Sequence, residues 1–575
     1  MSYWSPDNKV NIGDQVSTVV RSDQSLEYGA NNIIKIQVPE TTAEFIDPKN
    51  TYLNFEVKIK NTITGDANCR LSLDHKIGAQ ALIKNISIYC NNNQTLVEEI
   101  TDYNKYVSIL YDYEDNDILR QRRGQMEGTI PLNKNLINNI DNTATEAEYN
   151  DVKTNPYYVN NDTATFSDAD YCKAKVSLRL YTGLFGSDNI IPNALLGGLT
   201  VNITLENNVI PFEMVETTNY YQSGESYKRG LQFYGVDNTG ANWADASASS
   251  EFFCKATTNN MLTLDNLPIR VGSRINLTKS DKSTLTQFET AAPVDQQLKV
   301  KSLSIVNNNA TDEKLVRIEL SEAMTLKSGG AIDNTYFVYD IVSTEATALT
   351  PIYTISNVDL VVQSVKLKSN IEAMIMKAMN EQGKFVYDIN SIQNYRYSAL
   401  KSDTVLNMRL PIQNSRCFSI LSMPTDTTNY SALSKVSASD TYAISTGEHS
   451  TRSGLVGIYD GMRDYQYFYE KNQPQRPINV SKMSTPAVVG THLLGIENGL
   501  RSANIMPLSL SKHKKNFILG RQFTKNGGVY DARNKDFNIM CNYDNIGTKD
   551  KLWVNFVAHN RKIMISKDGS IQVSI

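Results

Sequence analysis

The stretch KLWVNFVAHNRKIMISKDGSIQVSI (residues 551–575) says most about the fold of this chain. Residues 552–558 are rich in branched and aromatic side chains, which predicts a strand buried on both faces. The dipeptide Asp568-Gly569 is typical of a two-residue hairpin turn, because both residue types tolerate positive φ angles. After it, apolar and polar residues alternate, so the last strand offers one face to a core. We therefore expect the chain to close by completing a β-sheet.

The overall composition indicates a folded protein with more than one domain. At 575 residues the chain exceeds a single hydrophobic core and predicts two large domains or three smaller ones. Hydrophobic residues make up 41% and charged residues 21%, which excludes a disordered chain. The net charge of -4 gives no electrostatic footprint for wrapping nucleic acid, so we expect no sequence-specific nucleic-acid binding.

The cysteines and the N-terminus bear on the compartment. Six scattered cysteines include no C-x-x-C pair, and we interpret them as small buried hydrophobic residues in a reducing compartment. The N-terminus MSYWSPDNKVNIGDQ has polar residues where a signal peptide needs an apolar block. No apolar run approaches the roughly 20 residues of a membrane span. We expect a protein that is not secreted.

Short strands dominate the pattern. Runs of five to eight apolar or alternating residues recur between Asn-, Asp-, Gly- and Ser-rich connections, which indicates an all-β sandwich or barrel class. Two short helices are expected, one over residues 101–113 and one that starts with Asn370 as its N-cap and stops at Gly383. Residues 133–170 and 217–250 are polar and read as long loops.

The motifs of catalysis are missing. None of the five histidines has a second ligand at metal-site spacing, and we predict neither metal nor cofactor. His449 lies in the loop sequence STGEHSTRSG, but no G-x-S-x-G nucleophile turn accompanies it. His559 is expected to be a structural histidine. The basic clusters at 120–123 and 512–515 read as solvated faces or salt bridges. We therefore expect no catalytic residues and no enzyme.

Several blocks, taken in order, resemble the major capsid proteins of the double jelly-roll virus lineage, which includes polinton-like viruses, adintoviruses, virophages and nucleocytoplasmic large DNA viruses. The first half supplies ALIKNISIYCNNNQTLVEEITDYNKYVSIL (81–110), SLRLYTGLFGSDNIIPNALLGGLTVNITLENN (177–208) and YTISNVDLVVQSVKLKSNIEAMIMKAM (353–379). The second half supplies VLNMRLPIQNSRCFSILSMP (405–424), YQYFYEKNQPQRPINVSK (465–482) and VNFVAHNRKIMISKDGSIQV (554–573). Their order and spacing carry the resemblance.

The resemblance implies an all-β fold of two consecutive eight-stranded antiparallel jelly rolls with long loops and a few short helices. It implies a dsDNA-virus structural protein that forms pseudo-hexagonal homotrimers, or capsomers, in an icosahedral shell. Its partners would be copies of itself and penton or minor capsid proteins, and the resemblance leaves open whether an internal membrane lies beneath. The protein would be made in the host cytoplasm or nucleus and would reside in the virion capsid.

The same block order divides the chain. We expect an N-terminal arm over residues 1–28, a first jelly roll over 29–396 with its extra length in loops, and a second jelly roll over 397–575. The segment LGGLTVNITLENN (196–208) echoes the last strands, but residues 357–368 are their better counterpart. The arm carries apolar residues that are expected to contact a partner beneath the shell: Trp4, Val10, Ile12, Val16 and Val19.

Two other functions remain as alternatives. A β-sandwich surface binding module, such as a glycan-binding adhesin, would carry an export signal and exposed aromatic and carboxylate clusters at its loop tips. A β-rich hydrolase would depend on His449.

Overall fold

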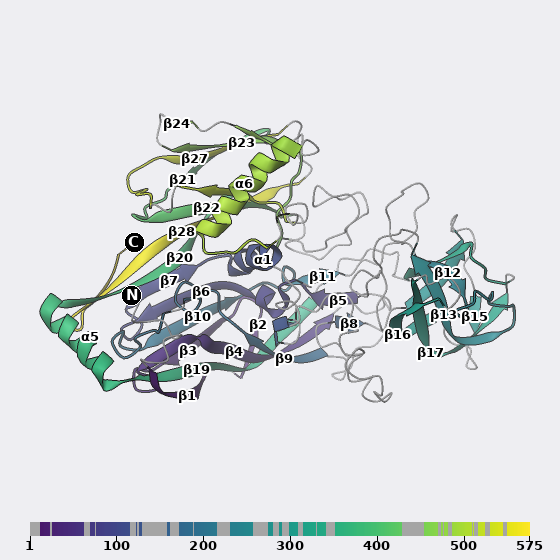
Figure 1. Ribbon diagram of the computed structural model, residues 1–575, viewed down its shortest axis with the longest axis horizontal. Coiled ribbons are helices and arrows are strands. Elements are labelled where there is room, and N and C mark those ends of the chain that lie inside the picture. Colours follow the sequence, from purple (N-terminus) through teal and green to yellow (C-terminus); the bar gives the residue numbers. More distant parts are fainter. Residues whose placement is uncertain are drawn as a thin grey trace.

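The protein is all-β, with a few short helices. The computed structural model describes residues 12–23, 26–61, 70–74, 76–114, 122–123, 126–128, 158–160, 172–187, 189–214, 231–256, 274–279, 287–289, 298–308, 314–328, 331–340, 351–427, 454–469, 473–474, 477–480, 486–508, 510, 516–523, 529–543 and 549–574. Within these residues the strands form six antiparallel sheets (Figure 1). The predicted fold class is confirmed.

The first two sheets form a jelly roll. One has the order β1 (Ile12–Arg21), β19 (Pro351–Leu367), β4 (Phe45–Asn61), β9 (Cys172–Leu178), and β2 (Glu27–Gly29) also pairs with β19. The other has the order β3 (Ile33–Val38), β10 (Leu199–Leu205), β6 (Ile83–Cys90), β7 (Thr95–Ile100). The chain crosses repeatedly between the sheets, and its last strand returns beside its first, which is the jelly-roll order.

The second jelly roll repeats this order. One sheet runs β20 (Lys384–Ala399), β28 (Lys551–Ser566), β22 (Cys417–Asp426), β26 (Leu519–Gln522), with β29 (Ile571–Ser574) beside β28. The other runs β21 (Val405–Leu410), β27 (Phe537–Tyr543), β23 (Met462–Tyr469), β24 (Gln473–Pro474), with β25 (Ile478–Asn479) beside β23. By its place in the sheet, β20 of the second roll therefore corresponds to β1 and β2 of the first roll, and β28 corresponds to β19.

Strand β20 bears on the division between the rolls, which the sequence analysis places after residue 396. Strand β20 pairs with β28 along its whole length, from Lys384 opposite Ser566 to Ala399 opposite Lys551. Helix α5 (Ser369–Gln382) joins β19 to β20 and ends at Gly383, whose φ of 69° is left-handed. The predicted Gly383 stop is confirmed, whereas Lys368 and not Asn370 occupies the N-cap position. We propose Gly383 as the boundary, because every residue after it up to Ala399 belongs to the second sheet pair.

A separate β-module is inserted between β10 and β19. It is a seven-stranded sheet in the order β13 (Ala248–Ala256), β12 (Leu231–Gly235), β18 (Tyr336–Asp340), β14 (Arg274–Lys279), β16 (Leu298–Asn307), β17 (Lys314–Ser328), β15 (Gln287–Glu289). Trp243 anchors its own core and packs on Phe252, with ring centroids 5.9 Å apart. The extra length of the first roll, including residues 217–250, is expected from the sequence to be loops. For the residues that form this seven-stranded module, that expectation is wrong.

A smaller sheet lies between the first roll and this module (Figure 1). It has three strands in the order β11 (Phe212–Met214), β5 (Arg70–Leu73), β8 (Tyr158–Asn160). A one-turn 3-10 helix, η1 (Gly78–Leu82), follows β5 and is buried throughout.

The C-terminal hairpin forms with a longer loop than predicted. Ile565 pairs with Ile571, and the N–H of Ser566 donates to the carbonyl of Ser570 at 2.9 Å. The loop is therefore residues 567–569, closed by the N–H of Gly569 donating to Ser566 at 3.0 Å. Gly569 has a φ of 80°, which matches a type I turn followed by a left-handed glycine rather than a two-residue turn.

Much of the expected arm lies in the first sheet. Residues 12–21 are strand β1, in which Val16 pairs with Ser364 and Val19 with Val361 of β19. Both valines are more than half exposed at this sheet edge. Ile12 pairs with Leu367, whereas Trp4 and Val10 lie outside the described residues.

Helix α6 (Pro486–Ser502) covers β26, the edge strand of its sheet. The two elements meet backbone to backbone, because a Cβ on Gly520 would lie 2.6 Å from the Cα of Ile496, and one on Gly499 would lie 2.9 Å from the amide nitrogen of Arg521. Covering an edge strand in this way removes a site of unwanted strand pairing.

This packing predicts that Gly520→Ala lowers the free energy of unfolding by about 1–3 kcal/mol, since the added methyl forces α6 away from β26. Gly490→Ala is the matched control, because this exposed helical position has no atom within 4 Å of its would-be Cβ. The control should stabilise the protein by about 0.5–1 kcal/mol through helix propensity. Urea unfolding of both variants measures this, and equal effects at the two glycines would contradict the close packing.

Candidate functional site: the junction of the two jelly rolls

The sheet β20-β28-β22-β26 forms the junction between the rolls, and its central strands β28 and β22 are buried on both faces. Trp553 and Val557 of β28 belong to the core of the second roll. Their neighbours Val554 and Phe556 face the opposite way and join the large core of the first roll. A sandwich strand ordinarily alternates apolar and polar residues, because its outer face meets water. Here the outer face meets another jelly roll, which explains why residues 552–558 carry apolar side chains on both faces, with Asn555 as the one polar residue.

Helix α1 (Tyr103–Tyr113) lies at this junction, against β6 and η1, and every one of its residues is buried. The ring of Tyr106 packs on Phe556, with centroids 5.6 Å apart. The hydroxyl of Tyr113 donates to the carbonyl of Asn516 at 3.0 Å. The sequence predicts that this helix packs on a sheet through a single apolar stripe. In the structure the helix is buried on all sides.

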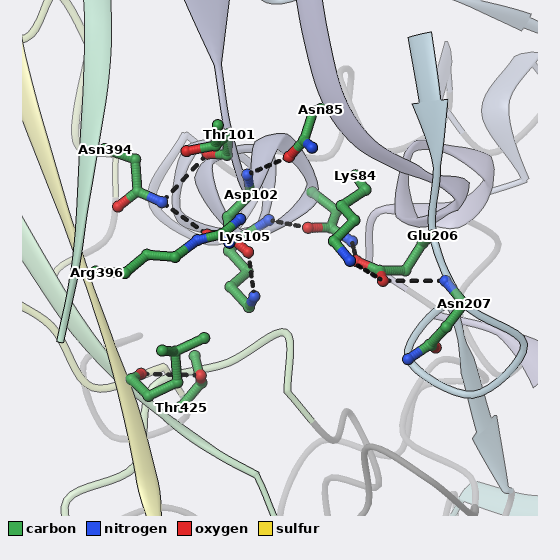
Figure 2. A network of polar contacts seen from close by, with 12 residues as sticks. Lys84, Asn85, Thr101, Asp102, Lys105, Glu206, Asn207, Asn394, Arg396 and Thr425 are labelled. Carbon is green, nitrogen blue, oxygen red and sulfur yellow. Dashed lines mark hydrogen bonds and ion pairs between the residues drawn. The ribbon is translucent and has the colours of Figure 1, made fainter. Parts of the chain in front are cut away.

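Asp102 precedes α1 and connects the rolls through charge (Figure 2). Its φ of 53° is left-handed, and its N–H donates to the side chain of Asn85 at 3.1 Å. One carboxylate oxygen accepts from Lys105 at 2.5 Å, and the other accepts from Arg396 at 2.5 Å and Asn394 at 2.7 Å. Arg396 and Asn394 belong to β20, so these bonds tie the start of α1 to the second roll.

Burial alone would raise the pKa of Asp102, because desolvation disfavours its charged form. The charges and hydrogen bonds of Lys105 and Arg396 outweigh that effect and hold the pKa below its ordinary value. Lys105 is only 2% exposed, so the pair is a buried ion pair whose two members depend on each other.

Glu98 on β7 is a second buried carboxyl at the junction. It accepts from the Ser391 hydroxyl of β20 at 2.6 Å, and from the backbone N–H groups of Gly183 at 2.7 Å and Leu184 at 3.0 Å. Burial raises its pKa, although these three donors and the charge of Arg561 oppose the rise. Three segments distant in sequence therefore converge on one side chain.

His559 and Arg561 of β28 complete this group. The Nε of Arg561 donates to Nε2 of His559 at 3.1 Å, which leaves Nδ1 as the protonated nitrogen, 3.2 Å from the carbonyl of Val557. Burial, together with the charge of Arg561, lowers the pKa of His559 to about 4, so the ring is neutral. Arg561 also donates to the carbonyl of Val97 in the first roll at 2.7 Å. His559 is structural, as the sequence predicts.

Asn516 is the polar centre at the other end of α1. Its amide nitrogen donates to Asp112 at 2.8 Å and lies 3.3 Å from the hydroxyl of Ser108. Its side-chain oxygen accepts from the N–H of Gly457 at 2.8 Å. One asparagine thus joins α1 to two loops of the second roll.

The residues expected to contact a partner lie elsewhere. Val16 and Val19 are exposed on β1 and do not belong to the junction. His449 and the basic cluster 512–515 fall outside the described residues. Of the basic cluster 120–123, Arg123 is buried, with its guanidinium 3.6 Å from the ring centroid of Tyr111. That part of the cluster is not a solvated face.

The burial of Asp102, Glu98 and Asn516 at the junction cannot be predicted from the sequence. Isolated Asp, Glu and Asn residues normally indicate a position exposed to solvent. The one available signal is that residues 552–558 are apolar on both faces, which requires a second partner for that strand.

Three further observations limit the chemistry of the described residues. They contain no group of three or more His, Cys, Asp or Glu side chains able to hold a metal ion. Their cysteines Cys90, Cys254, Cys417 and Cys541 are buried, and burial raises the pKa of Cys90 to about 11. Among the helices described, none is both long and apolar enough to span a membrane.

Comparison with known proteins gives structural relatives only. No protein family model matches the chain, and no curated protein matches it. The chain is similar in structure to viral major capsid proteins. VP54 of PBCV-1, from its fit into a reconstruction of the virophage Sputnik, has 9% identity and a TM-score of 0.43, over 98% of this chain and 97% of that one.

The Faustovirus major capsid protein has 9% identity and a TM-score of 0.44, over 96% of this chain and 90% of that one. The mavirus major capsid protein has 8% identity and a TM-score of 0.34, over 100% of this chain and 93% of that one.

The buried ion pair predicts that Asp102→Asn lowers the free energy of unfolding by about 3–5 kcal/mol, because Lys105 is left buried without a countercharge. Asparagine also tolerates the left-handed backbone, so the change removes the charge while keeping the turn. Asp536→Asn is the matched control. It breaks an ion pair with Arg409, whose side chain is 75% exposed, and should cost less than about 1 kcal/mol. Denaturant unfolding separates the two, and similar costs would contradict a role for Asp102 in joining the rolls.

Proposed function

We propose that the protein is a viral major capsid protein whose homotrimers tile an icosahedral shell. The observation that carries the proposal is the repetition, in one chain, of the same jelly-roll strand order, with the two rolls joined through strands β28 and β22, which are buried on both faces. The sequence blocks that resemble double jelly-roll capsid proteins fall on these same strands and helices.

The arrangement of two jelly rolls in one chain is suited to a trimer that packs in a hexagonal lattice. Each jelly roll closes its two sheets against each other, which leaves few free edges. Three chains related by a threefold axis would present six similar lobes, and closed cyclic symmetry makes such an assembly finite. A hexagonal outline requires the angle between the two rolls of a chain to be constant. The junction around α1 supplies that rigidity, because packed interfaces deform little.

The remaining assignments extend the same proposal. Partners are copies of this chain and penton or minor capsid proteins, and the location is the virion. The exposed Val16 and Val19 of β1 are proposed to contact a partner at the edge of the first roll. The function assigned is structural, without a catalytic step.

The trimer is tested by size-exclusion chromatography with light scattering on the full chain. We expect a particle of about three times the chain mass of 64.4 kDa, stable on dilution. Negative-stain images of that peak should show a hexagonal outline. A monodisperse monomer at micromolar concentration would contradict the proposal.

A further inference from the structure

A buried lysine and a buried aspartate meet between the two sheets of the second roll. Lys551 is the first residue of β28, and Asp460 lies just before β23, which belongs to the other sheet. Nζ of Lys551 donates to a carboxylate oxygen of Asp460 at 2.5 Å, and the two side chains are 1% and 4% exposed. The pair therefore joins segments 91 residues apart at a place that solvent hardly reaches.

The surroundings of the amine are largely aromatic. Nζ of Lys551 lies 4.8 Å from the ring centroid of Tyr543, and Trp553, two residues further along the same face of β28, is fully buried. Nζ also donates to the carbonyl of Lys549 at 2.9 Å. An ion pair in such a place carries a desolvation cost that its own attraction only partly offsets. A neutral link between the same two side chains would remove that cost.

A second buried carboxyl lies next to the pair. Asp426, at the end of β22, is only 1% exposed and stands directly opposite Lys551 in the register of β22 and β28. Directly opposed residues of antiparallel strands carry their side chains on the same face of the sheet, with Cβ atoms about 5 Å apart. The amine of Lys551 thus has one carboxyl in contact with it and another beside it.

From this geometry we propose that Lys551 and Asp460 condense to an isopeptide bond, which links the two sheets of the second roll covalently. The inference goes beyond the capsid role and does not depend on it.

The reaction needs no co-reactant, because an ammonium and a carboxylate together contain the atoms of one amide and one water. The ammonium of Lys551 passes one proton to the carboxylate of Asp460, and the freed lone pair of Nζ attacks Cγ, so that an N–C bond forms. Asp426 takes a second proton from Nζ and gives it to the leaving oxygen. The C–O bond breaks, that oxygen departs with both protons as water, and Nζ keeps one hydrogen.

Two features of the structure favour this outcome. The reacting groups are held in contact, and fixed contact of this kind corresponds to an effective concentration of about 10⁵ M or more. The amide N–H of the product also keeps a hydrogen-bond acceptor, because the carbonyl of Lys549 is already in place.

The other closely contacting buried pair, Lys105 with Asp102, differs in one respect. Its carboxylate also accepts from Arg396 and Asn394, and these donors stabilise the ionised form, which resists attack by an amine. We expect no bond there.

Mass spectrometry of the folded full chain tests the proposal. The intact mass should lie below the sequence mass by one water, and a tryptic digest should contain a branched peptide that joins Asp460 to Lys551. Asp460 precedes Gly461, and an Asp-Gly pair can also lose water by closing a succinimide ring. The branched peptide therefore decides between the two, since a succinimide leaves Lys551 unmodified.

Three variants and a matched control separate the roles. Lys551→Arg keeps the charge but removes the nucleophile, so the full sequence mass should return. Asp460→Asn should still form the bond with ammonia as the leaving group, which lowers the mass by one ammonia. Asp426→Asn should leave most chains without the bond, whereas Asp536→Asn, which removes a carboxyl from a surface ion pair of the same roll, should keep it.

The decisive measurement is made on the unaltered chain, so it does not depend on whether a variant folds. The full sequence mass, or a loss of water confined to Asp460 and Gly461 with Lys551 unmodified, would overturn the proposal. A branched peptide that persists undiminished in Asp426→Asn would overturn the role given to that carboxyl. A second loss of water at Lys105 and Asp102 would contradict the reason given for the choice of pair.

Discussion

The structure depends on one sheet whose central strands, β28 and β22, are buried on both faces. These two strands bury one side in their own jelly roll and the other against the first roll. Because Val554 and Phe556 would be exposed in an isolated second roll, the hydrophobic effect favours docking of the two rolls, at about 25 cal/mol for each Å² of apolar surface buried. The same sheet that completes one fold therefore joins the two.

Burying this much surface also buries polar groups. At the junction these groups form hydrogen bonds and ion pairs with segments that are distant in the sequence. Asp102 is neutralised by Lys105 beside it and by Arg396 across the junction. Glu98 is satisfied by a hydroxyl from one roll and backbone N–H groups from the other. Ion pairs of this kind add little net stability over apolar packing, but a displaced register would leave their charges unpaired. We infer that the apolar contacts hold the rolls together and that the polar contacts select one orientation.

The sequence predicts the parts of this arrangement that depend on local pattern. Periodicity and backbone preference predict three features: the strand at residues 552–558 with apolar side chains on both faces, the helix after residue 101, and the helix end at Gly383. It does not predict the inserted β-module, because short alternations such as Leu231–Gly235 lie among Asn-, Gly- and Ser-rich residues that indicate loops. It also misses β1, whose apolar residues are sparse and gain their strand structure from pairing with β19. The junction charges are invisible for a related reason, since each is meaningful only beside a partner far away in the chain.

The central claim is that the two rolls form one cooperative unit through the shared sheet. Native-state hydrogen exchange in increasing denaturant measures it most directly, by comparing peptides from β28 in the second roll with peptides from β6 and β10 in the first. The account predicts that these peptides converge on the same opening free energy and the same dependence on denaturant. Independent opening of β28, at a distinctly lower free energy while β6 and β10 stay protected, would contradict it.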